Sequence, residues 1–169
     1  MNRDGGSVTV PADSDELEVG ANLGIVIARK ACRLSEANAV EFVAGFIIVN
    51  DVSVPVQSHY RPNVRQKARD GFCPLGPAVV PRSSVPDPDS LGIRVYVDER
   101  LCASANTSGL IRNVATLLAD VTDFMTLAPG DVLAVGAAAP CPRVRAGQVA
   151  RIEIDGLGCL SNRFVKAVA

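Results

Sequence analysis

Residues that could carry acid–base chemistry follow one apolar segment of the chain. Residues 43–49 are apolar apart from Gly45 and run directly into Asn50 and Asp51. An acid at the end of a buried strand is costly unless it is paired, hydrogen-bonded or bound to a metal ion. The loop that follows carries four cations: Arg61, Arg65, Lys67 and Arg69. A carboxylate beside such a cluster indicates a site for a small carboxylate substrate.

Lys67 is the candidate for proton transfer in this loop. Like charges around a lysine favour its neutral form, which can accept a proton. The same pattern is also typical of a solvated basic loop, and Asn50 with Asp51 is also typical of a turn. His59 is the single histidine of the chain and lies in the same loop, where it could carry a proton or lie at the surface.

Asn106, Thr107 and Ser108 form a second candidate group. At a helix start, backbone N–H groups attract anions, and these side chains could present hydroxyl and amide groups to a ligand. The same residues could equally serve only as a helix cap.

Composition narrows the class of protein. The chain has 169 residues, 48% of them apolar, and a formal net charge of -1, which fits one domain and disfavours a nucleic-acid binder. No apolar stretch approaches the length of about 18 residues that a membrane span needs. The first residues show no apolar run behind a basic cap, so a cytoplasmic location is expected. The five cysteines are widely spaced, without a Cys-x-x-Cys pair, so we expect reduced thiols.

The sequence predicts short strands and one long helix. Residues 1–17 are expected to be a loose lead-in with one short strand, and residues 18–169 the domain proper. Apolar or alternating runs predict strands over 20–28, 44–52, 91–97, 132–135 and 149–154. Apolar residues recur at three and four between Thr107 and Met125, which predicts the long helix, and Ser35 precedes a short one. The proline-rich segment 74–88 is expected to be irregular.

Taken together, these blocks resemble the fumarylacetoacetate hydrolase superfamily. Its catalytic domain carries, in order, a Glu-x-Glu strand, Ala-Gly-Tyr, Asn-Asp-x-Ser, a lysine, Cys-Pro-x-Gly-Pro, Asn-Thr-Ser, Leu-x-Pro-Gly-Asp, Thr-Gly-Thr-Pro and Gly-x-Gly-x-Leu-x-Asn. The matching segments here are 44–46 (AGF), 50–53 (NDVS), Lys67, 73–77 (CPLGP), 106–108 (NTS), 127–131 (LAPGD) and 156–162 (GLGCLSN). The resemblance covers about residues 18 to 165.

Within the superfamily, residues 60–74 look most like the bifunctional isomerase/decarboxylase of 4-hydroxyphenylacetate (homoprotocatechuate) degradation, and the chain looks like its N-terminal half or subunit. The resemblance implies an α+β, mainly β fold: a mixed β-sandwich roll with one long helix and one or two short ones. It also implies a homo-oligomer, or a hetero-oligomer with a homologous subunit. The implied reactions are decarboxylation of 5-oxopent-3-ene-1,2,5-tricarboxylate and isomerisation of 2-hydroxyhepta-2,4-diene-1,7-dioate.

The resemblance also assigns roles to residues. It implies a divalent cation, magnesium or else manganese or calcium, with Asp51 as a ligand, and Lys67 as the catalytic residue that stabilises an enolate or moves a proton. Arg61 and Arg69 would hold the remote carboxylates of the substrate. The implied substrate-binding set is completed by Tyr60, Asn106, Thr107 and Gly136.

This sequence departs from the family pattern where the chemistry lies. The metal-binding Glu-x-Glu aligns with Gly20 and Asn22, and Thr-Gly-Thr-Pro has become residues 135–138 (VGAA). The leading hypothesis is therefore an active subunit that works with a homologous partner retaining the metal site, and there are two alternatives to it. One is a metal-deficient pseudoenzyme that serves as a structural or regulatory partner. The other is chemistry without a metal ion, performed by Lys67 and the arginines.

Overall fold

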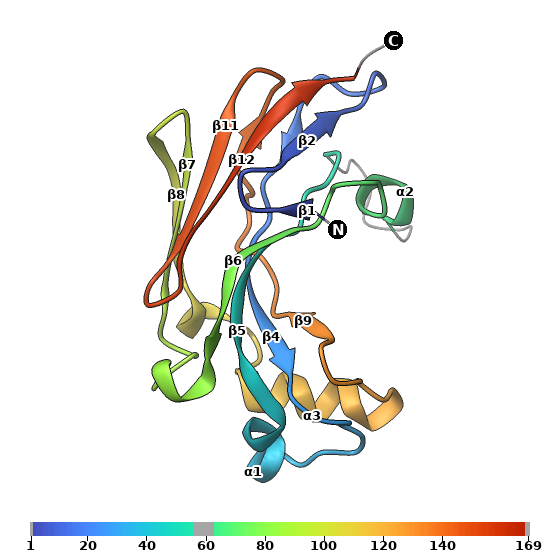
Figure 1. Ribbon diagram of the computed structural model, residues 1–169, viewed down its shortest axis with the longest axis vertical. Coiled ribbons are helices and arrows are strands. Elements are labelled where there is room, and N and C mark those ends of the chain that lie inside the picture. Colours follow the sequence, from blue (N-terminus) through green and yellow to red (C-terminus); the bar gives the residue numbers. More distant parts are fainter. Residues whose placement is uncertain (1, 56–62, 168–169) are drawn as a thin grey trace.

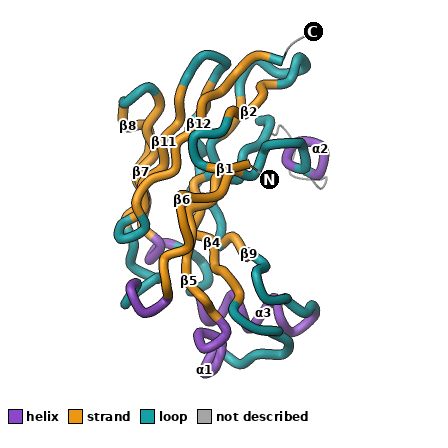
Figure 2. The backbone as a smooth tube through the Cα atoms, in the orientation of Figure 1, coloured by secondary structure: helices purple, strands orange, loops and turns teal. Residues whose placement is uncertain are grey.

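The structure is a computed structural model, and it describes residues 2–55 and 63–167. These residues form two five-stranded sheets and one two-stranded sheet, and most of the helical segments lie near one end of the molecule (Figure 1). Strands dominate the trace of the backbone (Figure 2), so the mainly β, α+β fold is confirmed. No helix in these two ranges is long and apolar enough to cross a membrane.

The first sheet has the order β1-β6-β5-β4-β9 and the second the order β2-β12-β11-β7-β8. Strands of the first sheet are β1 (Asn2–Arg3), β6 (Pro74–Pro81), β5 (Val43–Asn50), β4 (Ala21–Ile27) and β9 (Val132–Ala134). Strands of the second sheet are β2 (Ser7–Val10), β12 (Gly158–Lys166), β11 (Val149–Ile154), β7 (Gly92–Val97) and β8 (Arg100–Asn106). The two-stranded sheet pairs β10 (Arg143–Val144) with β3 (Leu17–Glu18).

The core lies between the two large sheets. Strands β4, β5 and β6 contact β7, β11 and β12, and the side chains that meet there are apolar. Leu23 and Ile25 of β4, and Phe46 and Ile48 of β5, are completely buried. Strands β7 and β11 alternate buried and half-buried residues, as their sequence pattern predicts, because only one face of the second sheet meets the core.

The lead-in contributes two strands to the sheets instead of one. Strand β1 pairs parallel with β6, and β2 pairs parallel with β12 at the edge of the second sheet. Val8 and Val10 of β2 are buried in the core, whereas Ser7 and Thr9 are exposed. This alternation fixes the face of β2 that turns inward.

The proline-rich segment is more regular than its sequence predicts. Residues 74–81 form β6, which lies between β1 and β5, and an irregular turn comes only afterwards. The pairing with β5 shifts between Phe46 and Ile48, so that Pro77 falls within a bulge of β6. A bulge leaves residues out of the ladder, which accommodates a proline that has no N–H group to donate.

The helices are shorter than the apolar periodicity predicts. The short helices are α1 (Glu36–Ala39), α2 (Val64–Lys67), η1 (Val40–Phe42), η2 (Arg82–Ser84) and η3 (Thr107–Gly109). The long helix, α3 (Val114–Phe124), begins seven residues after Thr107, because η3 ends in extended backbone at Leu110. Its cap is Asn113, whose side chain accepts a hydrogen bond of 2.8 Å from the N–H group of Thr116.

Candidate functional site

Asp51 and Lys67 form an ion pair at the end of the first sheet. Asp51 directly follows β5, and Lys67 is the last residue of α2, so the fold joins two residues that the sequence places in one block. The Lys67 Nζ atom donates a hydrogen bond to Asp51 Oδ2. The side chains keep 44% and 38% of their surface exposed, so a substrate or solvent can reach the pair.

Asn22 connects the middle of the first sheet to the loop after β9. It lies on β4 with only 1% of its surface exposed. Its Oδ1 atom accepts a hydrogen bond of 2.6 Å from the N–H group of Gly136, and its Nδ2 atom donates one of 3.1 Å to the carbonyl oxygen of Gly20. Asn22 thereby holds the predicted substrate residue Gly136 in place.

The residues at the implied metal site do not fit a divalent cation. A Cβ atom on Gly20 would lie 2.3 Å from the carbonyl oxygen of Asp51, so no side chain of the usual kind can stand at that position. The neutral amide of Asn22 is already hydrogen-bonded, and Lys67 neutralises Asp51. Within 2–55 and 63–167, no group of three or more His, Cys, Asp or Glu residues could hold a metal ion. A hard cation needs several oxygen ligands, usually including carboxylates.

Glu18 is the carboxylate nearest in sequence to the altered positions, and its contacts are with other protein groups. Its Oε2 atom accepts a hydrogen bond of 3.4 Å from the Ser53 hydroxyl group, and its Oε1 atom lies 4.0 Å from Nε of Arg143. Strand β3, which carries it, pairs with β10. Glu18 thus supports the β3–β10 corner.

Arg69 is held by the lead-in. Its two Nη atoms donate hydrogen bonds of 3.2 and 3.1 Å to the carboxylate of Asp13, and its Nε atom donates one of 2.7 Å to the carbonyl oxygen of Arg65. The hydrogen bonding from Arg69 also lowers the pKa of Asp13. A substrate role for Arg69 would require it to leave this pairing or to share it. Tyr60, Arg61 and His59 lie outside the described residues.

Asn106 and Thr107 have separate tasks at the end of β8. The Oδ1 atom of Asn106 accepts a hydrogen bond of 2.8 Å from the N–H group of Ser108 and so caps η3. Thr107 is buried, and its Oγ1 atom accepts a hydrogen bond of 2.8 Å from the N–H group of Leu91. The capping use that the sequence left open therefore applies to Asn106.

A cavity of about 540 Å³ lies between the end of β8, the start of α3 and the loop after β9. Its volume is within the range of about 300–1,000 Å³ that small-molecule sites occupy. It brings together two predicted substrate residues, Asn106 and Gly136, which are 30 positions apart in the sequence. Arg112 is its one charged lining residue among the described part of the chain, and the sequence reasoning did not select it. Its position four residues after Ser108, close to a group already selected as a candidate, is the signal that could have found it.

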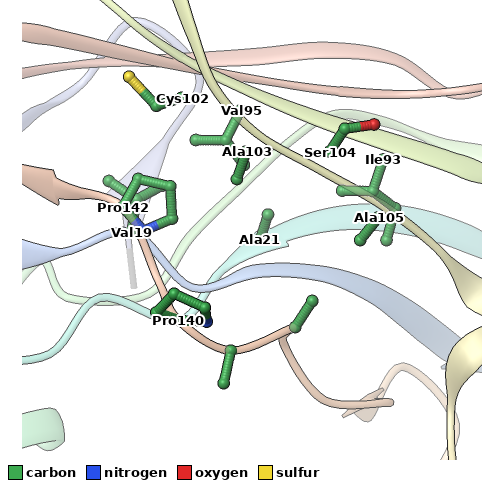
Figure 3. Close-up of a pocket in the computed structure, with 12 residues that line it drawn as sticks. Val19, Ala21, Ile93, Val95, Cys102, Ala103, Ser104, Ala105, Pro140 and Pro142 are labelled. Atoms are coloured by element: carbon green, nitrogen blue, oxygen red, sulfur yellow. The ribbon is translucent and has the colours of Figure 1, made fainter.

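A second cavity is apolar and unsuited to an acidic substrate. It has a volume of about 270 Å³ and lies between β7, β8 and residues 138–142 (Figure 3). Val19, Ile93, Val95 and Pro140 surround it, and none of its lining residues is charged. Carboxylates would find no cation there.

Two cysteines lie within electrostatic range of the ion pair. Burial, with a smaller contribution from the negative charge of Asp51, raises the pKa of Cys73. Burial, followed by the charge of Glu18, raises the pKa of Cys141. Both thiols therefore stay protonated at neutral pH and are poor nucleophiles.

Comparison with known proteins places the chain. Residues 1–165 match the sequence profile described as Fumarylacetoacetate (FAA) hydrolase C-terminal, and the chain belongs to that family. It is 37% identical over 157 residues to the 4-hydroxyphenylacetate degradation bifunctional isomerase/decarboxylase of Escherichia coli, a match that spans 92% of this chain and 37% of the relative. The chain thus covers well under half the length of that protein.

Solved structures agree with the fold. The 5-carboxymethyl-2-hydroxymuconate delta-isomerase of Mycobacterium smegmatis superposes with a TM-score of 0.92 and 32% identity, covering 99% of this chain and 66% of the other. A maleylpyruvate hydrolase of Sphingobium sp. SYK-6, in complex with manganese (II) ion and pyruvate, superposes with a TM-score of 0.90 and 29% identity. The match covers 98% of this chain and 61% of the hydrolase. These three relatives are thus an isomerase/decarboxylase, an isomerase and a hydrolase, and the hydrolase has been seen with manganese.

Proposed function

We propose that this chain is a subunit, or one half, of an isomerase/decarboxylase of 4-hydroxyphenylacetate degradation. Its substrates would be 5-oxopent-3-ene-1,2,5-tricarboxylate and 2-hydroxyhepta-2,4-diene-1,7-dioate. The observation that carries the proposal is the accessible Lys67–Asp51 pair. Two of the predicted substrate residues, Asn106 and Gly136, line a cavity of suitable size. The identity to the Escherichia coli isomerase/decarboxylase supports this substrate class.

Lys67 supplies the cation that both reactions need. In the isomerisation, the 2-hydroxyl group loses its proton and C5 gains one, and a dienolate carries the negative charge in between. In the decarboxylation, the bond to the departing carboxylate breaks, its electron pair remains on the substrate as an enolate, and carbon dioxide leaves. An ammonium group beside the enolate oxygen stabilises this charge and can exchange a proton with it. Asp51 orients the ammonium group through the ion pair.

The chain is expected to work with a homologous partner that retains the Glu-x-Glu strand. Gly20 and Asn22 leave this chain without the ligands for a divalent cation, and a retained site in the partner would supply magnesium, manganese or calcium. Such an assembly could be a homo-oligomer only if the chemistry needs no metal ion. All five cysteines are free thiols, which supports a reducing cytoplasmic setting.

Gly20 also favours a second candidate function. Because the backbone of Asp51 fills the space where a side chain at position 20 would stand, the loss of the metal site is built into the packing. A chain with this feature could be a pseudoenzyme that keeps the fold and a regulatory or structural interface. It would then influence the activity of its partner without contacting the reacting atoms.

Reconstitution separates the two functions. The chain is mixed with a homologous subunit that retains the Glu-x-Glu strand, and turnover of both substrates is measured with wild-type chain and with Lys67→Met. The proposed function predicts turnover that the variant abolishes. Turnover that is unchanged by Lys67→Met would establish the pseudoenzyme, and a complex without turnover of either substrate would refute the proposed function.

A further inference from the structure

We propose that Arg112 binds the carboxylate of the substrate that is remote from the reacting end. The inference rests on the proposed function, because a dicarboxylate is required. It goes beyond the roles that the family resemblance assigns, which gives the remote carboxylates to Arg61 and Arg69. Arg69 already donates three hydrogen bonds to protein acceptors, so a carboxylate would have to compete for it.

The composition of the cavity wall points to Arg112. Apart from this arginine, the wall consists of Asn106, glycine backbone and apolar side chains, among them Leu110, Leu117 and Val135. An apolar wall with a single guanidinium group matches a substrate with a carbon chain between two carboxylates. The backbone of Gly136, held by Asn22, borders the same space.

The guanidinium group is oriented but not used up by its protein partner. Its Nε atom donates a hydrogen bond to Asp120 on α3, and its side chain keeps 53% of its surface exposed. Its two Nη atoms have no acceptor in the described part of the chain. These atoms can form two parallel hydrogen bonds with a carboxylate, and fixing Nε beforehand reduces the entropy that binding must overcome.

Binding of unreactive acids tests this role without any need for turnover. Heptanedioate and heptanoate have the same carbon chain but differ in one carboxylate, and the affinity of the full chain for each is measured by calorimetry. We expect the wild-type chain to prefer the diacid by about tenfold or more, as expected for a charge-assisted hydrogen bond. Arg112→Gln should remove this preference, and Arg112→Lys should retain part of it.

Two further variants separate a specific role from a general effect of charge. Arg82→Gln removes an exposed arginine from η2, outside the cavity, and should keep the wild-type preference. Asp120→Asn keeps the guanidinium group while weakening its anchor, and should also prefer the diacid. If Arg112→Gln is folded by circular dichroism and keeps the preference, or if the wild-type chain shows none, the proposal is wrong.

The same measurement distinguishes this proposal from the proposed function. A selective loss of diacid binding in Arg112→Gln would support the binding role even if the reconstituted complex had no turnover. Turnover with a wild-type Michaelis constant in Arg112→Gln, together with unchanged binding, would overturn the role of Arg112 and leave the proposed function standing.

Discussion

The N–H group of Gly136 donates a hydrogen bond of 2.6 Å to the side chain of Asn22, which is buried in the neighbouring strand β4. One residue of the altered Glu-x-Glu position thus supports one residue of the altered substrate loop. In this chain the asparagine has a structural task at a position where the family resemblance assigns a metal ligand. The two departures from the family pattern are physically connected.

Asn22→Ala should destabilise the chain and loosen the loop that carries Gly136. Leaving the Gly136 N–H group without its acceptor costs about 1–3 kcal/mol. The free energy of unfolding from urea titration measures the effect. Asn38→Ala, which removes a side-chain acceptor at the exposed start of α1, is the control and should cost less. Equal stability of Asn22→Ala and the wild type would contradict the structural task of Asn22.

Gly20→Ala should also destabilise the chain, because its Cβ atom would lie 2.3 Å from the Asp51 carbonyl oxygen. Overpacking of this kind costs about 1–3 kcal/mol. Gly109→Ala is a matched control, since a Cβ atom there meets nothing within 4 Å. Thermal unfolding of both variants provides the comparison, and a Gly20→Ala variant as stable as Gly109→Ala would show that β4 can move away from Asp51.

Divalent cations should not stabilise the isolated chain. A metal ion present at about 100 times its Kd would raise the free energy of unfolding by about 2.7 kcal/mol. We expect no such increase with magnesium, manganese or calcium, because Gly20, Asn22 and the paired Asp51 provide no suitable ligand set. Thermal unfolding with and without each cation measures this, and a concentration-dependent rise in Tm would demonstrate a metal site.

Lys67→Met should abolish turnover of the reconstituted complex and leave the fold nearly as stable as before. The ion pair with Asp51 is more than one third exposed on both sides, and such pairs contribute only about 0–1 kcal/mol. Lys30→Met, a lysine outside the site, is the control for loss of charge. Steady-state rates and urea titrations are measured on both variants. A large loss of stability in Lys67→Met would mean that the pair is mainly structural.

Stability should fall at acidic pH partly through Asp155. The hydrogen bond from Arg94, followed by its charge and by the N–H group of Gly92, lowers the pKa of Asp155 below its usual value of 3.8. Because the folded-state pKa is the lower one, this contribution is complete above the unfolded-state value. It is lost as the pH falls through the folded-state pKa. Urea titrations from pH 7 to pH 3 should show a shallower acid decline for Asp155→Asn than for the wild type.

The sequence alone determined the elements whose residues have only one favourable environment. The continuous apolar runs of β4 and β5 are stable only when both faces are covered, and the alternation in β7 and β11 allows only one buried face. The family was recognised from the resemblance of several short motifs, among them 106–108 (NTS) and 127–131 (LAPGD), to those of its members. The sequence predicted helix α3 but placed its start too early. Apolar periodicity does not show that Asn106 caps the separate turn η3, or that α3 begins only after its own cap, Asn113.

Only the tertiary structure decided which residues meet at the site. The sequence grouped Lys67 with three arginines, yet Arg69 pairs with Asp13 of the lead-in, 56 positions away. The cavity joins Asn106, Arg112 and Gly136 because β8, α3 and the loop after β9 come from different parts of the chain. The pairing of β4 with β5 also brings the Asp51 backbone so close to Gly20 that no side chain fits there. Such contacts depend on how strands pair and sheets pack, which local patterns do not encode.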